Sequence, residues 1–304
     1  MTLPTSGILV IDKEEDWTSH DVVAALRPVL GTRRVGHGGT LDPFATGVLP
    51  ILYGRATGLA TYLHEAPKTY LAEMVLGSET TTDDRTGQPT ERAAVPRLDD
   101  ERVRDVFARF IGPRRQRPPA YSAILVRGVR SYVRARLGEA TEPPPRHIEI
   151  DEIAVVERDE ACIHFLVTCS AGTYVRALAR DLGRALGTLA HLGALRRIAA
   201  GGFSVDEAIT VERARDLAAA GALGALVHAS DVAALALRGV IVTPESARRL
   251  RAGQPVGRPL GTGVGELRAY DTGGEFVGLT QAEADLLRPA RIFAPEEGTQ
   301  GASR

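Results

Sequence analysis

The sequence predicts an α+β fold with a mixed sheet, followed by a small C-terminal β-barrel. Segments typical of strands and of helices succeed one another without the regular alternation of a doubly wound sheet. An Ala- and Gly-rich passage at 217–237 separates this body from a shorter region that contains hairpin signals. We therefore expect a first domain over 1–236 with a basic insertion near 102–146, a second domain over 237–295 and a disordered tail over 296–304.

The chain opens with a strand and a helix. The apolar run "GILVIDK" at 7–13 is typical of a buried strand. In the following "TSHDVVAALRPVL", Thr18 or Ser19 can cap a helix, because a hydroxyl accepts a hydrogen bond from the free backbone N–H groups of the first turn. The inward stripe of this helix would consist of Val22, Val23, Leu26 and Leu30.

Strands dominate the middle of the chain. "TYLAEMVLG" at 69–77 alternates as a half-buried strand does, and "IEIDEIAVVE" and "ACIHFLVTC" are predicted to form a hairpin that turns at Asp159 and Glu160. Cys162 and Cys169 stand seven residues apart in the second of these strands and therefore on opposite faces of it. They cannot form a disulfide with each other.

A helix follows the hairpin, and the terminal region mixes strands with one short helix. In "SAGTYVRALARDLGRALG", Thr173 can cap a helix that places Arg176 and Arg180 on a common face. Its inward stripe would consist of Val175, Leu178, Leu182 and Leu186. Beyond residue 236 we expect a strand in "GVIVT", a helix over "PESARRLRAG", a hairpin around "DTGG" and a strand in "PARIF".

Charge is distributed unevenly over the 304 residues. The net charge of −1 argues against a nucleic-acid binder, but the segment 102–136 holds ten arginines and one acid, Asp105. This segment can present a positive field to a phosphate backbone; the alternative is a solvated arginine-rich face. Since only two of the 37 basic residues are lysines, Lys13 and Lys68 mark positions where a compact ammonium is required.

Several classes of protein are disfavoured. The hydrophobic share of 44% and the charged share of 25% are ordinary for a globular protein. The chain has no secretory leader pattern and no run of about 18 apolar residues, so we expect a cytoplasmic protein. No Cys and His spacing indicates a metal centre, and neither a GxGxxG nor a P-loop motif occurs.

The stretch "RVGHGGTLDPFATGVLP" at 34–50 points to a functional carboxylate, Asp42. An Asp before Pro commonly caps a helix, but here barely one turn is left before the apolar strand that begins near Gly47. The pair Gly38 and Gly39 permits close approach of another backbone or a ligand, and the proline biases Asp42 toward an extended conformation. This pattern favours a carboxylate presented at the tip of a loop.

These residues resemble a known family. "GHGGTLDPFATGVL", "PKTY" and "GTYVRALARDLG" resemble the three signature motifs of the stand-alone bacterial tRNA pseudouridine-55 synthases, the TruB family, and "YSA" and "LRRIAAGGFSVDEAI" fit its order. The resemblance covers about 7–212, and 238–293 more weakly resembles the small RNA-binding barrel called PUA. It implies a mixed, mostly antiparallel sheet with flanking helices, and isomerisation of uridine 55 in the tRNA T-loop to pseudouridine without metal or cofactor.

The resemblance also implies three catalytic residues. Asp42 would act as a nucleophile at C1′ or as a base at C2′, and the sequence leaves this choice open. Arg176 would pair with Asp42 and keep it ionised in a dry pocket. Tyr70 would stack on the flipped-out base, and its hydroxyl would serve proton removal at C5.

Contacts to the tRNA follow from the same resemblance. His37 would occupy the space that the flipped base leaves in the T-loop, Leu195 would line the pocket, and Lys68 would support the site or a phosphate. The arginines expected to hold the T-arm are Arg114, Arg115, Arg117, Arg127 and Arg130. We expect a monomer that acts on tRNA and not at a membrane.

One departure and three alternative functions remain. Where the family's first strand continues "DKPxGxTS", this chain has "DKEEDWTS", so Glu14 and Asp16 leave the conformation of the local turn open.

A guide-RNA-dependent pseudouridine synthase would share the catalytic motifs but typically lacks the long basic insertion. A non-catalytic tRNA-binding or RNA-chaperone protein would not need Asp42 with Arg176, and a nucleoside hydrolase would show a second catalytic acid.

Overall fold

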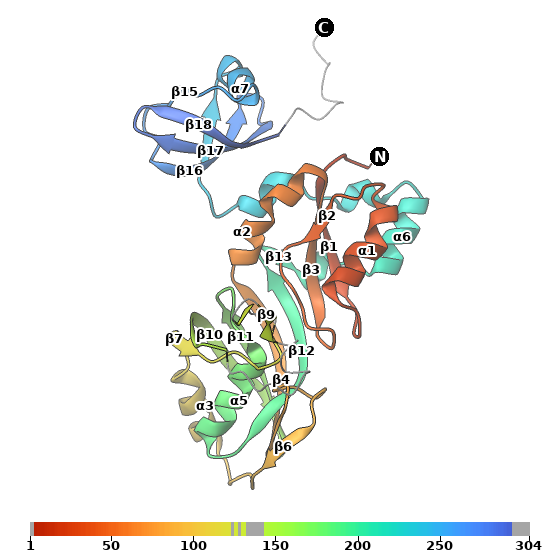
Figure 1. Cartoon of the computed structure of the whole chain (residues 1–304), viewed down its shortest axis with the longest axis vertical. Coiled ribbons are helices and arrows are strands. Elements are labelled where there is room, and N and C mark those ends of the chain that lie inside the picture. The colour runs from red at the N-terminus through yellow and green to blue at the C-terminus, as the bar shows by residue number, and fades with distance from the viewer. Residues whose placement is uncertain (1–2, 123–124, 127–128, 132–142, 294–304) are drawn as a thin grey trace.

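The core of the molecule is a nine-stranded sheet. The computed structural model describes residues 3–122, 125–126, 129–131 and 143–293 (Figure 1). The main path of the sheet runs β1 (Gly7–Lys13), β3 (Thr46–Tyr53), β12 (Ala190–Ala200), β4 (Lys68–Leu76), β11 (Cys162–Cys169), β10 (Arg146–Arg158) and β7 (Gly112–Gln116), while β2 (Val35–His37) pairs with β3 and β13 (Phe203–Ser204) with β12. Its pairs are antiparallel except β3 with β12, so the predicted mixed, mostly antiparallel sheet is confirmed.

Helices flank this sheet at two places. The helices are α1 (Ser19–Val29), α2 (Ala60–Glu65), α3 (Asp100–Ala108), α5 (Val175–Leu186) and α6 (Val211–Ala219), with 3-10 turns η1 (Gly54–Leu59), η2 (Val205–Glu207), η3 (Leu223–Leu226) and η4 (Ser230–Ala234). Two small ladders pair β5 (Ser78–Thr80) with β6 (Pro89–Arg92) and β8 (Leu125–Val126) with β9 (Val129–Arg130). Figure 1 shows α3 and α5 together in the lower half and α1 beside α6 in the upper half of the body.

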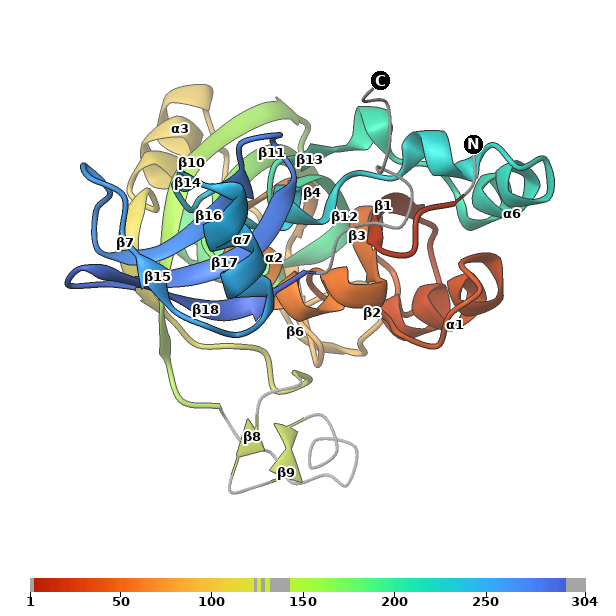
Figure 2. The ribbon, with the colours of Figure 1, turned by 90° about the horizontal axis from the view of Figure 1, so that it is seen from above.

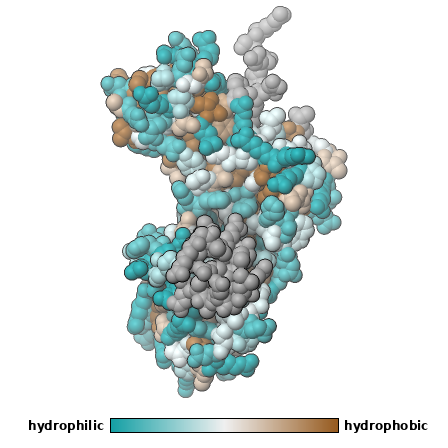
Figure 3. Space-filling view, in the orientation of Figure 1, coloured by the Kyte–Doolittle hydropathy of each residue, from teal (hydrophilic) through white to brown (hydrophobic). Residues whose placement is uncertain are grey.

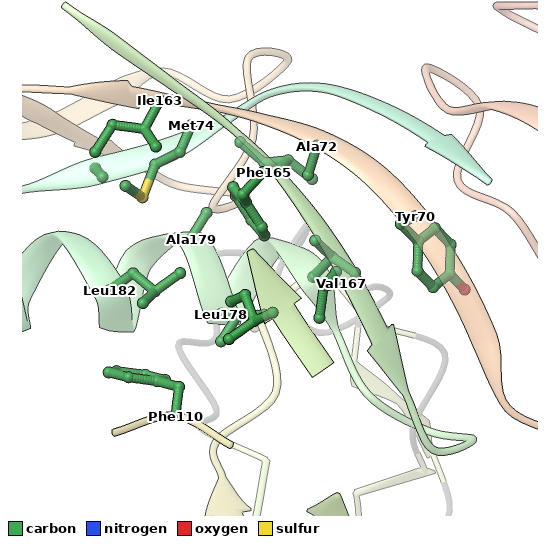
Figure 4. Packing of buried hydrophobic residues seen from close by; sticks show 14 of the residues in the cluster. Tyr70, Ala72, Met74, Phe110, Ile163, Phe165, Val167, Leu178, Ala179 and Leu182 are labelled. Carbon is green, nitrogen blue, oxygen red and sulfur yellow. The ribbon is translucent and has the colours of Figure 1, made fainter. Parts of the chain in front are cut away.

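One apolar core lies between the sheet and α5. The inward side chains of β4 alternate from Tyr70 through Ala72 to Met74, as the sequence predicts. They pack with Phe165 of β11 and Leu178 of α5, which are 0% and 1% exposed (Figure 4). In Figure 4 Tyr70 lies at one end of this row, apart from the other labelled side chains. The core therefore holds the strand that carries Tyr70.

The helix ends bear out one predicted cap and correct another. Thr18 caps α1 with a full capping box, in which its hydroxyl accepts from Asp21 N at 3.0 Å and its own N–H donates to the Asp21 carboxylate at 2.9 Å. The prediction that Thr173 caps α5 is wrong, because Tyr174 is the N-cap. No side chain of the described residues caps α5; the Gln116 amide holds the backbone of Tyr174 instead, since its Oε1 accepts from Tyr174 N at 2.9 Å and its Nε2 donates to Tyr174 O at 3.0 Å.

A five-stranded sheet forms the C-terminal part. Its order is β14 (Gly239–Val242), β16 (Gly265–Asp271), β17 (Phe276–Glu283), β18 (Leu286–Ile292) and β15 (Val256–Gly257), with helix α7 (Pro244–Arg251) after the first strand. Except for β15, these elements occur where the sequence predicts them, and the sheet is strongly twisted in Figure 2. With β14 and β15 at its edges, the sheet is a curled half-barrel, consistent with a PUA-like unit. The tail predicted at 296–304 lies outside the described residues.

This second sheet docks on the first through shared contacts. Leu279 and Phe293 belong to the same buried cluster as Leu59 and Ala234 of the body. Asp231 of the body accepts a hydrogen bond of 2.6 Å from the Tyr270 hydroxyl of the second sheet. The parts of the chain before and after the proposed domain boundary near residue 236 therefore pack against each other through an apolar interface.

Removing the second sheet should destabilise the body. A chain that ends at Ala236 leaves the apolar surface around Leu59 and Ala234 without its cover from Leu279 and Phe293. We expect the Tm of the truncated protein to fall by about 5 °C or more, since exposing apolar surface of the body that the second sheet buries costs about 25 cal/mol per Å². A thermal melt by circular dichroism measures it. A truncated protein that melts at the full-length temperature would show that the body is stable by itself.

The surface shown in Figure 3 is mostly hydrophilic, with small hydrophobic patches. Ile241 and Leu260, both in the C-terminal part, are exposed apolar side chains. Among the described residues, no helix has both the length and the apolar character that a membrane span needs.

Candidate active site

Asp42 lies in the loop 38–45, which joins β2 to β3. Two glycines let this loop approach its surroundings closely. A Cβ on Gly38 would lie 2.8 Å from the Leu63 side chain, and Gly39 has a φ of +146°. The Asp42 side chain is 35% exposed, so the carboxylate is held at an accessible loop tip, as the sequence suggests.

Arg176 meets Asp42 from the first turn of α5. Its Nη2 donates to Asp42 Oδ1 at 3.1 Å, and its Nε lies 2.9 Å from Oδ2 without the alignment of a hydrogen bond. Nη1 donates to Thr82 O at 2.9 Å and lies 3.4 Å from a carboxylate oxygen of Asp84. Since the Arg176 side chain is only 6% exposed, the guanidinium is fixed between two carboxylates and can orient that of Asp42.

The segment 79–84 is held to α5 by a ladder of ion pairs that the sequence did not reveal. Arginines at every fourth position of α5 each meet an acid of this segment: Arg176 with Asp84, Arg180 with Asp83 at 2.8 Å, and Arg184 with Glu79 at 2.6 Å. Asp84 is also satisfied locally, because its Oδ1 accepts from the hydroxyls of Thr82 and Thr86. The sequence shows that these arginines are spaced four residues apart. It does not reveal their acidic partners, which lie about 100 residues away.

Tyr70 and Leu195 lie on adjacent strands, β4 and β12, beside the pair of Arg176 and Asp42. Both side chains point into the core on the face toward α5, with 9% and 7% exposure. Leu41, which directly precedes Asp42, belongs to the same cluster. Burial raises the pKa of the Tyr70 phenol, while the nearby Arg197 guanidinium opposes this rise. The arrangement brings an aromatic ring and an apolar wall close to the Asp42 loop.

His37 is half-buried at the start of the same loop. Its Nδ1 accepts from Gly39 N at 3.3 Å, and its ring stacks on that of His64 with 5.9 Å between the centroids. Burial, the largest cause, lowers the pKa of His37 to about 4. The ring is therefore neutral at pH 7 and contributes shape and hydrogen bonds to the site.

The low pKa of His37 should make the protein sensitive to acid. As the pH falls from about 6.5 to about 4, the unfolded chain takes up a proton at His37 that the folded chain refuses, so stability is lost in this window. We expect His37→Asn to lose less Tm than the wild type between pH 7 and pH 4.5. The exposed His147→Asn is the control and should behave as wild type. Equal losses for wild type and His37→Asn would contradict the buried neutral state.

Both lysines of the chain are structural ammonium groups. Lys68 Nζ donates to the carbonyl oxygens of Leu63, His64 and Ala66 at 3.0, 2.5 and 2.6 Å. Lys13 Nζ likewise donates to three carbonyl oxygens, one of them that of Pro43 beside Asp42. An ammonium has three donors, and at Lys68 carbonyl oxygens use all three. This arrangement does not favour a phosphate contact by Lys68 and leaves its other predicted role, structural support of the site.

The structure also defines the conformation of the turn at 14–16, where the sequence departs from the family pattern. Asp16, where the family pattern has Gly, adopts a φ of +66°. Its N–H donates to Pro43 O at 2.9 Å. The left-handed conformation that suits glycine is thus kept by an aspartate and tied to the Asp42 loop.

The predicted RNA-binding arginines are only partly placed. Arg114 is half-buried, with its guanidinium 3.8 Å from the centroid of the Phe110 ring. Arg115 and Arg117 are exposed on and beside β7, and they line a cavity together with Arg180 and Arg184. Arg127 and the side chain of Arg130 lie outside the described residues. This cavity lies along the middle and last turns of α5, and its lining holds four arginines and one acid, Asp181.

Family models match three consecutive parts of the chain. Residues 27–175 match the model described as TruB family pseudouridylate synthase (N terminal domain). Residues 176–247 match the tRNA pseudouridylate synthase B C-terminal domain, and residues 239–293 match the Pseudouridine synthase II TruB C-terminal model. Together they cover the nine-stranded sheet from α1 onward and the C-terminal sheet.

Curated relatives cover nearly the full length. A tRNA pseudouridine synthase B of Geobacter sulfurreducens is 40% identical over 301 residues, which covers 94% of this chain and 99% of the relative. One of Synechococcus elongatus is 40% identical and covers 96% and 99%. Among solved structures, a chain in a Cbf5-Nop10-Gar1 complex is 26% identical with a TM-score of 0.76, covering 96% of this chain and 86% of that chain.

Proposed function

The chain belongs to the TruB family of pseudouridylate synthases, and from this premise we propose that it isomerises uridine 55 in the T-loop of tRNA to pseudouridine. The observation that carries the proposal is the contact of the Arg176 guanidinium with the Asp42 carboxylate beside Tyr70. A binding protein has no need to hold an ionised carboxylate in this way. The proposal includes action as a monomer in the cytoplasm.

The reaction explains these residue types. The N1–C1′ bond of uridine breaks, the uracil turns, C5 bonds to C1′, the C5 proton leaves and N1 gains a proton. Asp42 would attack C1′ as a nucleophile or remove a proton from C2′ as a base. Arg176 would hold this carboxylate in a fixed orientation, since its guanidinium is anchored at the same time by Thr82 O and Asp84.

The remaining residues handle the detached base. The target base must leave the folded T-loop, and Tyr70 offers a ring on which a flipped pyrimidine can stack. Leu195 supplies an apolar wall, and the Tyr70 hydroxyl can assist removal of the C5 proton. His37, neutral and directly before the Asp42 loop, would fill the gap left in the T-loop. Arg114, Arg115 and Arg117 would contact backbone phosphates of the T-arm.

Sequence relatives favour a stand-alone enzyme over a guide-RNA-dependent one. The chain is about 40% identical to tRNA pseudouridine synthases B over nearly its full length. Its likeness to the chain of the Cbf5-Nop10-Gar1 complex is weaker in sequence, at 26%. We therefore propose that the chain selects its uridine by its own contacts with the T-arm.

Carbodiimide labelling of a T-arm transcript tests this function. Pseudouridine retains the label after alkali and stops primer extension, so we expect one new stop, at position 55. Labelling only after addition of a guide RNA would indicate the guide-dependent function. An abasic site would indicate a hydrolase, and binding without any product would indicate a chaperone.

A further inference from the structure

Arg197 is a buried cation to which the proposed reaction assigns no role. It lies on β12, is 1% exposed and is among the largest fully buried side chains of the described residues. None of the ion pairs found among the described residues involves it. Burial lowers the pKa of its guanidinium, which remains a cation. A buried charge without a carboxylate is costly, so its contacts call for an explanation.

The Arg197 guanidinium spans both ends of the Asp42 loop. Its Nη2 donates to Gly39 O at 3.0 Å and its Nη1 to Thr40 O at 3.4 Å, on the side of the loop before Asp42. Its Nε donates to Val48 O at 2.6 Å, after the loop has entered β3. One planar group thus fixes the separation of the two chain segments that carry Asp42 between them.

The same guanidinium also reaches the Tyr70 phenol. Arg197 and Tyr70 stand opposite each other in the β12–β4 pairing, so their buried side chains lie on one face of the sheet, and the guanidinium opposes the rise that burial causes in the pKa of the phenol. Because a guanidinium has only donors, it favours an approach through the phenol oxygen and not through the phenol hydrogen. Arg197 therefore orients the phenol that the proposed reaction places beside the uracil.

The backbone around Arg197 is built to allow this approach. At Gly47, opposite Arg197 in the parallel β3–β12 pairing, a Cβ would lie 2.1 Å from Arg197 O. At Gly39 a Cβ would lie 3.6 Å from Arg197 Nη1. Gly47 therefore lets β3 lie directly against the backbone of Arg197, whereas the distance at Gly39 is an ordinary van der Waals contact and its φ of +146° is the reason for glycine there.

We propose that Arg197 is a positioning residue that joins the Asp42 loop and Tyr70 into one unit and so sets the distance between the carboxylate and the phenol. This inference rests on the proposed function of the site. Arg197 does not touch the substrate; it acts through Asp42 and Tyr70. It should therefore influence the chemical step much more than tRNA binding.

Single-turnover kinetics of Arg197→Lys tests the proposal. A lysine keeps the charge but cannot reach Gly39, Val48 and Tyr70 together. We expect a rate constant at least about a hundredfold lower with a tRNA Kd within about twofold of wild type. The matched control is Arg196→Lys, the neighbouring residue, which pairs with Asp12 and is 38% exposed; its rate should stay within about threefold.

Coupling to Tyr70 separates positioning from general structural damage. In a Tyr70→Phe background, Arg197→Lys should cost at least about fivefold less rate than in the wild type, because part of its effect passes through the missing hydroxyl. Equal costs in both backgrounds, or an Arg197→Lys rate within about threefold of an active wild type, would overturn the proposal. An inactive wild type would instead overturn the proposed function.

A stability measurement covers the case in which Arg197→Lys does not fold. Tyr70→Phe removes the phenol oxygen from beside the buried Arg197 guanidinium, so its Tm should fall by about 2–6 °C. The control Tyr270→Phe removes a hydroxyl that bonds Asp231 far from this loop. Unchanged Tm for Tyr70→Phe would show that the Arg197–Tyr70 contact does not join the two elements, and the proposal would fail.

Discussion

Asp42→Asn protein is expected to bind a T-arm transcript with unchanged or slightly tighter affinity and to isomerise its uridine at least about a thousandfold more slowly. The substitution keeps the shape and hydrogen-bonding capacity of the side chain and removes its charge. Both mechanisms open to Asp42 need that charge, at C1′ or at C2′. Affinity should survive, because phosphate contacts by arginines away from the carboxylate supply most of it.

A purely structural role for Asp42 gives the opposite expectation. Asn caps a helix about as well as Asp, so a capping aspartate could be replaced almost silently. The measurement is a single-turnover conversion beside a filter-binding titration, with circular dichroism to confirm folding. If folded Asp42→Asn protein converts uridine within about tenfold of the wild-type rate, the aspartate is not the catalyst.

Arg176→Lys should have the second-largest effect, with a rate at least about a hundredfold lower. The guanidinium touches Asp42, Asp84 and the carbonyl of Thr82 at once. A lysine ammonium is a point donor that cannot keep all three contacts, so the carboxylate loses its fixed orientation while keeping a nearby positive charge.

The matched control for Arg176 lies one turn further along α5. Arg180 has similar burial and pairs with Asp83 at 2.8 Å, but it does not contact Asp42. Arg180→Lys should therefore keep its rate within about tenfold of wild type, and both variants should bind tRNA normally. Equal losses for the two variants would show that the ladder acts only as a structural clamp.

The sequence predicts the elements better than the contacts between them. The strand at 7–13, the Thr18 cap and the hairpin that turns after β10 depend on local periodicity and capping chemistry, and all are confirmed. Thr173 looked like a cap for the same local reason. The helix begins one residue later, after Tyr174, whose backbone is held by the amide of Gln116, 58 residues away in sequence. Local rules cannot anticipate such a distant partner.

The sequence predicted only those site residues that lie in a recognisable motif. The pairing of Arg176 with Asp42 was expected from resemblance, and the two residues do meet. Arg197 was missed because no strand was predicted over 190–200, so the alternation that places Leu195 and Arg197 on one face was not used. Its partners are carbonyl groups about 150 residues away, which no side-chain pattern reveals. Asp84 was hidden in the same way.

Release of tritium from C5 tests the central claim most directly. Forming a bond between C5 and C1′ expels the C5 hydrogen, so a T-arm transcript made with [5-³H]uridine releases tritium only when a uridine is isomerised. We expect the wild-type chain to release the tritium of one uridine per transcript, and none above background from a transcript with cytidine at position 55. Equal release from both transcripts, or no release from either, would contradict isomerisation of uridine 55 by this protein.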